Sequence, residues 1–166
     1  VTKEIIDRKD VEVRFYGPQD ELLQQQIERN KLTDIVTQYG LIPRESSFEK
    51  QRESQLLLLL YWNDPEVKGW YPLKGFEYLA SQRPILVTGG TGGDVVEKLM
   101  HQTKAGLYCR NRMEIIDRLS QLYLEYKEKG RIDNSKIDIN EINKFNYKNA
   151  ANKFTVILND LIKKRG

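Results

Sequence analysis

The residues from Gly69 to Glu77 carry groups suited to binding a phosphorylated ligand. Pro72 precedes a predicted helix that begins near Leu73, and proline is comfortable at a helix start because it leaves no backbone N–H unpaired. The free amides of the first helical turn attract anions, and Lys74 adds a positive charge beside them. Glu77 lies one turn further on, where its carboxylate could accept hydrogen bonds from sugar hydroxyls. On composition alone, a solvated Lys74–Glu77 pair on a surface helix explains these residues better.

A glycine-rich turn follows the next apolar run and reads Gly89-Gly90-Thr91-Gly92-Gly93-Asp94. Glycines permit positive φ and let the backbone come close to a ligand. The spacing is neither that of a Walker A sequence nor that of a dinucleotide fingerprint. Taken alone, the turn is therefore a nonspecific signal.

Short apolar runs alternate with amphipathic stretches, and these elements must position the two loops. The runs cover residues 11–16, 35–39, 56–62, 84–88 and 106–109. The continuous run Leu56–Leu60 is typical of a strand buried on both faces of a parallel sheet. The alternation predicts one α/β domain with a doubly wound, Rossmann-like parallel sheet, right-handed crossovers and three α/β/α layers. In such a sheet ligands bind at the carboxyl ends of the strands, where both loops lie.

The helices have readable ends and faces. Asp94 with Glu97, and Asn111 with Glu114, have the spacing of capping boxes, and Gly130 is a stop signal. Residues 131–146 are polar and predict a connector, and a last helix is expected over 146–164. The predicted apolar faces comprise Leu22, Leu23 and Ile27 in the first helix, Ile115, Ile116, Leu119, Leu122, Tyr123 and Tyr126 after Asn111, and Ala150, Ala151, Phe154, Ile157, Leu158, Leu161 and Ile162 in the last.

Composition excludes several classes of protein. The 27 basic and 24 acidic residues are interleaved, which is not the concentrated stripe of a nucleic-acid-binding protein. His101 and Cys109 are single, so we expect neither a disulfide nor a metal site, a core position for Cys109, and a cytoplasmic location. No apolar run is long enough to span a bilayer. The basic cluster 163–165 fits a helix C-terminus, with contact to an anionic membrane surface as the alternative.

Residues 72–86 closely resemble the donor-site signature of GT-B glycosyltransferases, most of all the bacterial retaining family, glycosyl transferases group 1, that makes capsule, exopolysaccharide and lipopolysaccharide. Members of that family carry a Pro-x-Lys-x-x-Glu-Tyr-x-Ala segment followed by Pro-Val/Ile, and Pro72 to Ile85 has this pattern. The resemblance extends in the same order to residues 39–43, 92–97 and 105–107. It therefore covers most of the chain, from about Val11 to Gly130.

This resemblance implies that residues 1–166 are the C-terminal nucleotide-sugar-binding domain of a GT-B enzyme whose N-terminal acceptor domain is absent from this chain. The whole enzyme would be a hexosyltransferase that moves a sugar from a UDP- or GDP-linked donor to an acceptor glycan or glycolipid, in the cytoplasm or at the inner face of the membrane. It implies no metal, no other cofactor and no catalytic residue in this half, and we expect the isolated domain to be inactive. The implied donor-binding residues are Lys74, Glu77, Trp70, Tyr71, Leu73, Gly40, Pro43, Arg44, Gly90, Gly92 and Gly93.

Within that set the resemblance assigns Glu77 to the ribose hydroxyls, Lys74 and the amides of 70–73 to the diphosphate, and residues 39–44 to the base. The chain departs from the family pattern at two places. Gly69 stands where many members have a second glutamate that faces the donor sugar. The Arg and Lys that clamp the diphosphate usually lie near the start of this half, and that pair cannot be placed in this sequence. Two other functions stay open, a nucleotide-sugar epimerase of the same architecture and a non-catalytic nucleotide-binding module.

Overall fold

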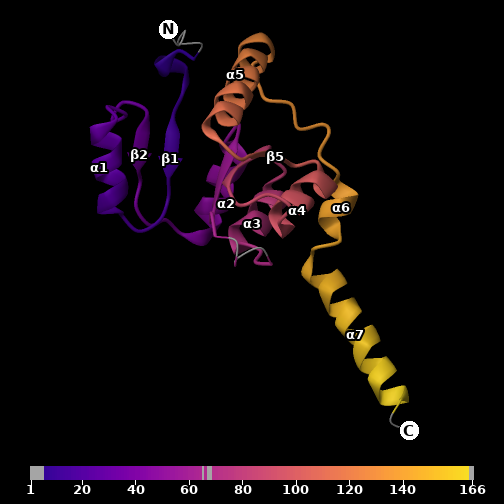
Figure 1. Cartoon of the computed structure of the whole chain (residues 1–166). Coiled ribbons are helices and arrows are strands. Elements are labelled where there is room, and N and C mark those ends of the chain that lie inside the picture. The colour runs from indigo at the N-terminus through magenta and orange to yellow at the C-terminus, as the bar shows by residue number, and fades with distance from the viewer. Residues whose placement is uncertain (1–5, 65, 67–68, 165–166) are drawn as a thin grey trace.

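The computed structural model describes residues 6–64, 66 and 69–164. These residues form an α/β protein with five parallel strands, one short 3-10 helix and seven α-helices, as the alternating sequence pattern predicts (Figure 1). The strands are β1 (Val13–Phe15), β2 (Val36–Gln38), β3 (Leu57–Tyr61), β4 (Ile85–Gly89) and β5 (Gly106–Cys109). The helices are η1 (Arg8–Asp10), α1 (Glu21–Arg29), α2 (Arg44–Glu53), α3 (Leu73–Ser81), α4 (Val95–Thr103), α5 (Arg112–Lys129), α6 (Ile139–Asn143) and α7 (Tyr147–Lys163).

The strands form two sheets and not the single sheet that the sequence predicts. β1 pairs with β2, and β3, β4 and β5 pair in that order, all in parallel. Figure 1 shows β1 and β2, with α1 beside them, set apart from the three-stranded sheet. The single-sheet expectation rested on strand count, and apolar patterning does not say which strands exchange hydrogen bonds.

The core lies on one face of the three-stranded sheet. Alternate residues of β3 and β4 point toward this face and pack against α3 and α4. Its buried apolar residues are Leu57, Leu59, Tyr61, Leu79, Ile85, Val87, Val96, Leu99, Met100 and Ala105. On the opposite face Leu86 and Cys109 are buried, which confirms the core position predicted for the lone cysteine.

The opposite face is uncovered over β3, which corrects the sequence prediction. Leu58 is 37% exposed and Leu60 is 62% exposed, although a strand buried on both faces was expected. Leu86, which pairs with Leu58 in the neighbouring strand, is buried. The helix α5 packs on β5 on this face of the sheet, and it does not reach far enough to cover Leu58 and Leu60 of β3.

The helix ends agree well with the predicted signals. Asp94 and Asn111 accept hydrogen bonds from the first-turn amides of α4 and α5, and Gly130 ends α5 with a φ of 69°. The short helix α6 was not predicted and lies in the expected connector, with Asp138 as its cap. On α1, Ile27 is buried as expected but Leu22 is 72% exposed, so the predicted face is wrong at that residue.

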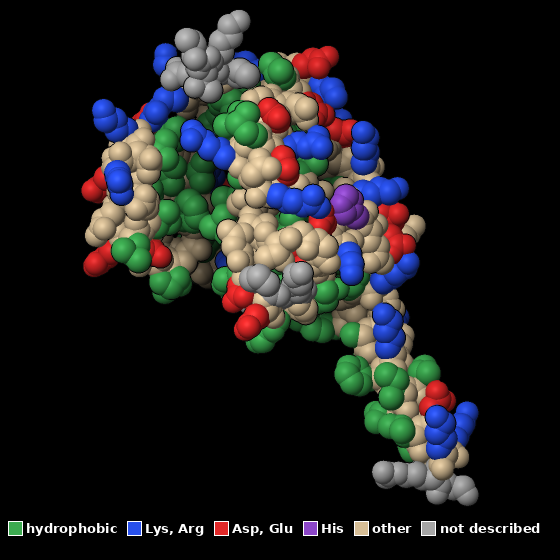
Figure 2. Space-filling model, in the orientation of Figure 1, with side chains coloured by type: hydrophobic (Ala, Val, Ile, Leu, Met, Phe, Trp, Pro, Cys, Tyr) green, Lys and Arg blue, Asp and Glu red, His purple; other side chains and the backbone are tan. Residues whose placement is uncertain are grey.

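The last helix has no cover among the described residues. Its bounds agree with the prediction of 146–164, yet Phe154, Ile157, Leu158, Leu161 and Ile162 are all more than half exposed. In Figure 1 α7 extends away from the rest of the chain, and Figure 2 shows hydrophobic side chains along it. Lys163 ends this helix, as predicted for its basic cluster, and Arg165 lies outside the described residues. No helix of the described residues is both long and apolar enough to cross a membrane.

Candidate functional site

Two neighbouring helices, α2 and α3, begin without a side-chain cap. Pro43 and Pro72 occupy their N-cap positions, and neither helix receives a side-chain hydrogen bond at its first turn. The other described α-helices are capped by Asp20, Asp94, Asn111, Asp138 and Asn146. Because the first amides of a helix have no intrahelical acceptor, those of α2 and α3 are left open to an anionic ligand or water.

Arg44 and Glu77 connect these two helix starts. Nη2 of Arg44 lies 3.9 Å from Oε1 of Glu77, and the guanidinium also sits 5.5 Å from the centre of the Phe48 ring. Arg44 follows β2 and Glu77 follows β3, so their contact brings the carboxyl ends of the two sheets to the same side of the protein. The Arg44 side chain is 77% exposed and that of Glu77 is 34% exposed, which leaves both accessible to a ligand.

A buried hydrogen bond fixes α2 against α3. The Ser81 hydroxyl donates to Oε1 of Gln51 at 2.8 Å, and both residues are buried. Ser81 lies at the end of α3 and Gln51 near the end of α2, so the bond ties the two helices at the end opposite Arg44. Sequence reasoning missed α2, because its apolar residues are too few to show helical periodicity.

The loop between β3 and α3 carries the exposed aromatic residues of the predicted site. Trp70 is 68% exposed, and its carbonyl oxygen accepts a hydrogen bond of 2.8 Å from the Tyr61 hydroxyl. Tyr71 packs on Phe76 with ring centres 5.5 Å apart. Lys74 is exposed at the start of α3, and Leu73 is the first residue of that helix. Residues 65, 67 and 68 of this loop lie outside the described residues.

The turn after β2 is shaped by Gly40. This residue has a φ of 77°, in the left-handed region, and its carbonyl oxygen accepts from the Gly17 amide at 2.9 Å. Beside it, Tyr39 stacks on Tyr16 with ring centres 5.2 Å apart. The turn leads directly into Pro43 and Arg44, which places the predicted base-binding segment beside the start of α2.

Three glycines at the end of β4 and in the turn after it, Gly89, Gly90 and Gly92, are explained by packing within the protein. A Cβ atom on Gly89 would lie 2.1 Å from the Tyr61 carbonyl oxygen, and one on Gly90 would lie 1.8 Å from the Tyr108 hydroxyl. Gly92 faces Arg110, with 3.3 Å between a Cβ atom and Nε. Gly89 also approaches Asn63 of the preceding loop, so the two predicted loops are neighbours. The ligand contacts predicted for Gly90, Gly92 and Gly93 stay predictions.

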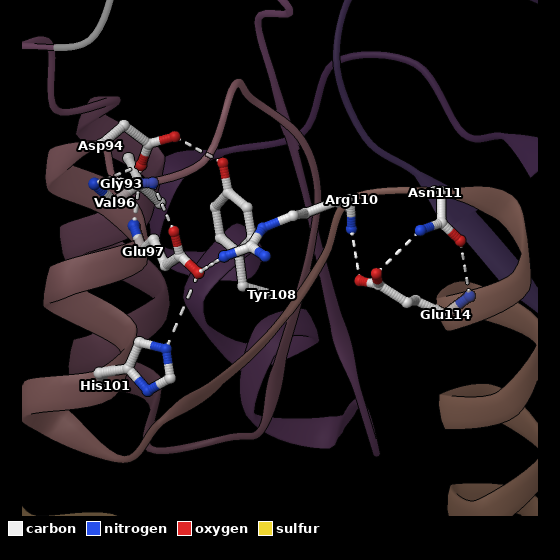
Figure 3. Close-up of polar contacts among 9 residues, drawn as sticks. All are labelled: Gly93, Asp94, Val96, Glu97, His101, Tyr108, Arg110, Asn111 and Glu114. Carbon is white, nitrogen blue, oxygen red and sulfur yellow. Dashed lines mark hydrogen bonds and ion pairs between the residues drawn. The ribbon is translucent and has the colours of Figure 1, made fainter.

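A polar network joins the carboxyl end of β5 to this glycine turn and to the start of α4 (Figure 3). Asp94, which is 2% exposed, accepts from the amides of Val96 and Glu97 through Oδ1 and from the Tyr108 hydroxyl through Oδ2 at 2.5 Å. Burial, followed by this hydrogen bond, holds the pKa of Tyr108 well above its ordinary value. Both carboxylate oxygens of Asp94 are used, so its role here is to fix the turn.

Glu97 joins the same turn to Arg110. Its Oε2 accepts from the Gly93 amide at 2.6 Å, and its Oε1 accepts from Nη2 of Arg110 at 2.5 Å. These bonds, the Gly93 bond first, lower the pKa of the carboxyl group, which is 12% exposed. His101 lies 3.9 Å from the same oxygen (Figure 3). The spacing of Asp94 and Glu97 predicted the helix cap. The contacts that Tyr108 and Arg110 make with these two residues join distant parts of the sequence, so no local pattern predicted them.

The structure thus gathers the predicted residues into two adjoining groups. Arg44, Glu77 and the loop 70–74 surround the open starts of α2 and α3, and the glycines of 89–93 form a braced turn next to them. Among the described residues no group of three or more His, Cys, Asp or Glu side chains could hold a metal ion. Neither the models of known protein families nor the curated proteins give a match to this sequence.

Proposed function

We propose that this chain is the donor-binding half of a GT-B retaining glycosyltransferase, and that the nucleoside diphosphate of a nucleotide sugar binds between the starts of α2 and α3. The observation that carries the proposal is the pair of uncapped helix N-termini joined by Arg44 and Glu77. Neither open start alone would specify a nucleotide. Two of them, together with a carboxylate that can accept from hydroxyls, match the charged and the sugar parts of one ligand.

In this proposal the amides at the start of α3 and the Lys74 ammonium group bind the diphosphate. Helix dipoles and cations stabilise the negative charge that develops on the departing diphosphate as the sugar leaves it. No side chain has to move for this step, because Lys74 is exposed and Pro72 leaves the first turn open. This half of the enzyme thus contributes positioning and electrostatic stabilisation.

Glu77 accepts hydrogen bonds from the ribose hydroxyls, and the turn from Gly40 to Arg44 contacts the base. The contact between Arg44 and Glu77 supports this arrangement, since it brings the base-binding segment within reach of the ribose-binding carboxylate. The full reaction is transfer of the sugar to an acceptor hydroxyl of a glycan or glycolipid, with the acceptor held by a second domain. The protein then acts in the cytoplasm or at the inner membrane face.

The first test is titration of the chain with UDP, GDP and their common sugar conjugates, followed by calorimetry or NMR. We expect one base class to bind and Glu77→Ala and Lys74→Ala to weaken it at least tenfold. Glu49→Ala on α2 and Lys98→Ala on α4 are matched controls, because both side chains are exposed outside the site. Binding that the controls weaken equally, or no binding by the full-length protein, would contradict the proposal.

A further inference from the structure

Each of the two sheets has an open hydrogen-bonding edge in the described part of the chain: β1 pairs only with β2, and β3 pairs only with β4. Successive backbone groups of a strand point to opposite edges, so alternate residues bond to one neighbour. Leu57 donates to Pro84, which directs residues 57, 59 and 61 toward β4 and turns Leu58 and Leu60 to the open edge. On β1, Val13 donates to Ile35 and Phe15 accepts from Tyr39, which leaves Arg14 facing outward.

The open edges lie beside a hydrophobic recess. Figure 1 shows β1, and not β2, as the strand nearer to the three-stranded sheet. Figure 2 shows hydrophobic side chains in the recess between this two-stranded unit and the rest of the chain. Leu58 and Leu60 are exposed on β3, whereas Leu86 on the next strand is buried on the same face. A parallel sheet normally has both faces covered, so β3 has the composition of an interior strand in the position of an edge.

The two-stranded unit is held in place at both ends. At one end Asp10, just before β1, accepts hydrogen bonds from the Tyr123 hydroxyl at 2.5 Å and from Nζ of Lys127 at 3.0 Å, both on α5. At the other end β2 continues into α2, which the Gln51–Ser81 bond fixes to α3. The Arg44–Glu77 contact sets the carboxyl ends of both sheets on one side.

We propose that one further β-strand, contributed by a part of the full-length protein outside residues 1–166, inserts in parallel between β1 and β3. A single strand has two hydrogen-bonding edges, so it satisfies Arg14 on one side and Leu58 and Leu60 on the other. It joins the strands into one sheet in the order β2-β1-new strand-β3-β4-β5. The inserted segment is extended, lacks proline and is apolar, because a strand in the middle of a parallel sheet has both of its faces covered in the completed fold.

The source of the strand is the same polypeptide. A position in the middle of a parallel sheet is part of the hydrophobic core, and a strand there completes the fold rather than binding to a finished surface. The inference is independent of the proposed function, since it rests on the sheet edges and not on any ligand. Loss of nucleotide binding would leave it untouched.

Backbone amide exchange tests the proposal in the 166-residue chain and in the full-length protein. In the 166-residue chain we expect the amides of Leu58 and Leu60 to exchange rapidly while that of Leu59 is protected. In the full-length protein the Leu58 and Leu60 amides become protected by about 100-fold or more. Equal exchange in both proteins would overturn the proposal. Protection that appears in a dimer of the 166-residue chain would identify a second copy as the occupant and overturn it as well.

A pair of substitutions gives an independent readout. Leu60→Lys and Leu124→Lys replace leucines of similar exposure, 62% and 59%, on β3 and α5. Both should leave the thermal midpoint of the 166-residue chain nearly unchanged. In the full-length protein Leu60→Lys should lower the midpoint by several degrees, because the lysine then lies beside the apolar side chains of the inserted strand, and Leu124→Lys should not. Equal midpoints for the two variants of the full-length protein would count against insertion at β3.

Discussion

Arg44 at the start of α2 lies 3.9 Å from Glu77 in the second turn of α3. Both side chains reach solvent, so the pair is a weak contributor to stability. The contact matters because it brings the turn after β2 close to the helix after β3. The helices themselves are joined by the buried Gln51–Ser81 bond.

Substitution of this pair should therefore separate binding from folding. Arg44→Ala and Glu77→Gln should each weaken nucleoside diphosphate binding about tenfold, which corresponds to about 1.4 kcal/mol. The unfolding midpoint should hardly change, because exposed ion pairs contribute about 0–1 kcal/mol. Calorimetric titration and thermal unfolding measure the two effects, with Arg52→Ala at the far end of α2 as the control. A large loss of stability with unchanged affinity would show that the pair is structural.

The turn at Gly90 should tolerate no side chain. Gly90→Ala places a Cβ atom on the Tyr108 hydroxyl at a φ of 79°, whereas Gly93→Ala meets only the strain of positive φ, at 68°, with no atom within 4 Å. We expect about 1 kcal/mol of destabilisation for Gly93→Ala and clearly more for Gly90→Ala, measured by urea unfolding. Adding Tyr108→Phe to Gly90→Ala should recover part of the loss. Equal costs for the two alanines would refute the packing explanation.

Glu97 should make stability depend on acid. Its pKa is lowered in the folded protein, so its contribution is fully present above its ordinary value of 4.5 and is lost as the pH falls through the folded pKa. Glu97→Gln should lower the free energy of unfolding by about 1 kcal/mol near pH 7 and by less near pH 3. The reason is that the bonds to Gly93 and Arg110 are charge-assisted only while Glu97 is ionised, so at pH 3 the substitution removes less. Urea unfolding at both pH values measures this difference, with Glu49→Gln as an exposed control. A cost that is the same at pH 7 and pH 3 would exclude an ionised Glu97.

Deletion of residues after Asn146 should leave the rest of the fold intact. Nearly all of α7 is exposed and its apolar face packs on nothing among the described residues, so its removal exposes little new surface. We expect a change in the thermal midpoint of less than about 2 °C and a lower tendency to associate, as measured by scanning calorimetry and sedimentation. A fall of ten degrees would mean that α7 packs on the core in solution.

The sequence predicted what depends on local chemistry. The five strands, the Asp94 and Asn111 caps and the stop at Gly130 all follow from residues a few positions apart. The exposure of Leu60 could not be predicted, because it depends on which strand lies next to β3 and not on the run of leucines itself. The same holds for Tyr108 with Asp94, which meet only because β5 ends beside the start of α4.

The candidate site was predictable only in part. Lys74 and Glu77 stood out because a helix start and a family resemblance coincide there. The arrangement of Arg44 could not be read from residues 44–53, since α2 has no amphipathic pattern. What places Arg44 is the buried pair Gln51 and Ser81, two polar residues whose pairing no periodicity reveals.

The loop between β3 and α3 also gives the protein an intrinsic fluorescence signal at the candidate site. Its two tryptophans, Trp62 and Trp70, both lie at the carboxyl end of β3 and are 57% and 68% exposed. The Tyr61 ring is 5.9 Å from that of Trp62, close enough to pass its excitation on. All of the indole emission of this chain therefore originates beside the starts of α2 and α3. Quenching or a spectral shift in unlabelled protein would report directly on what enters that space.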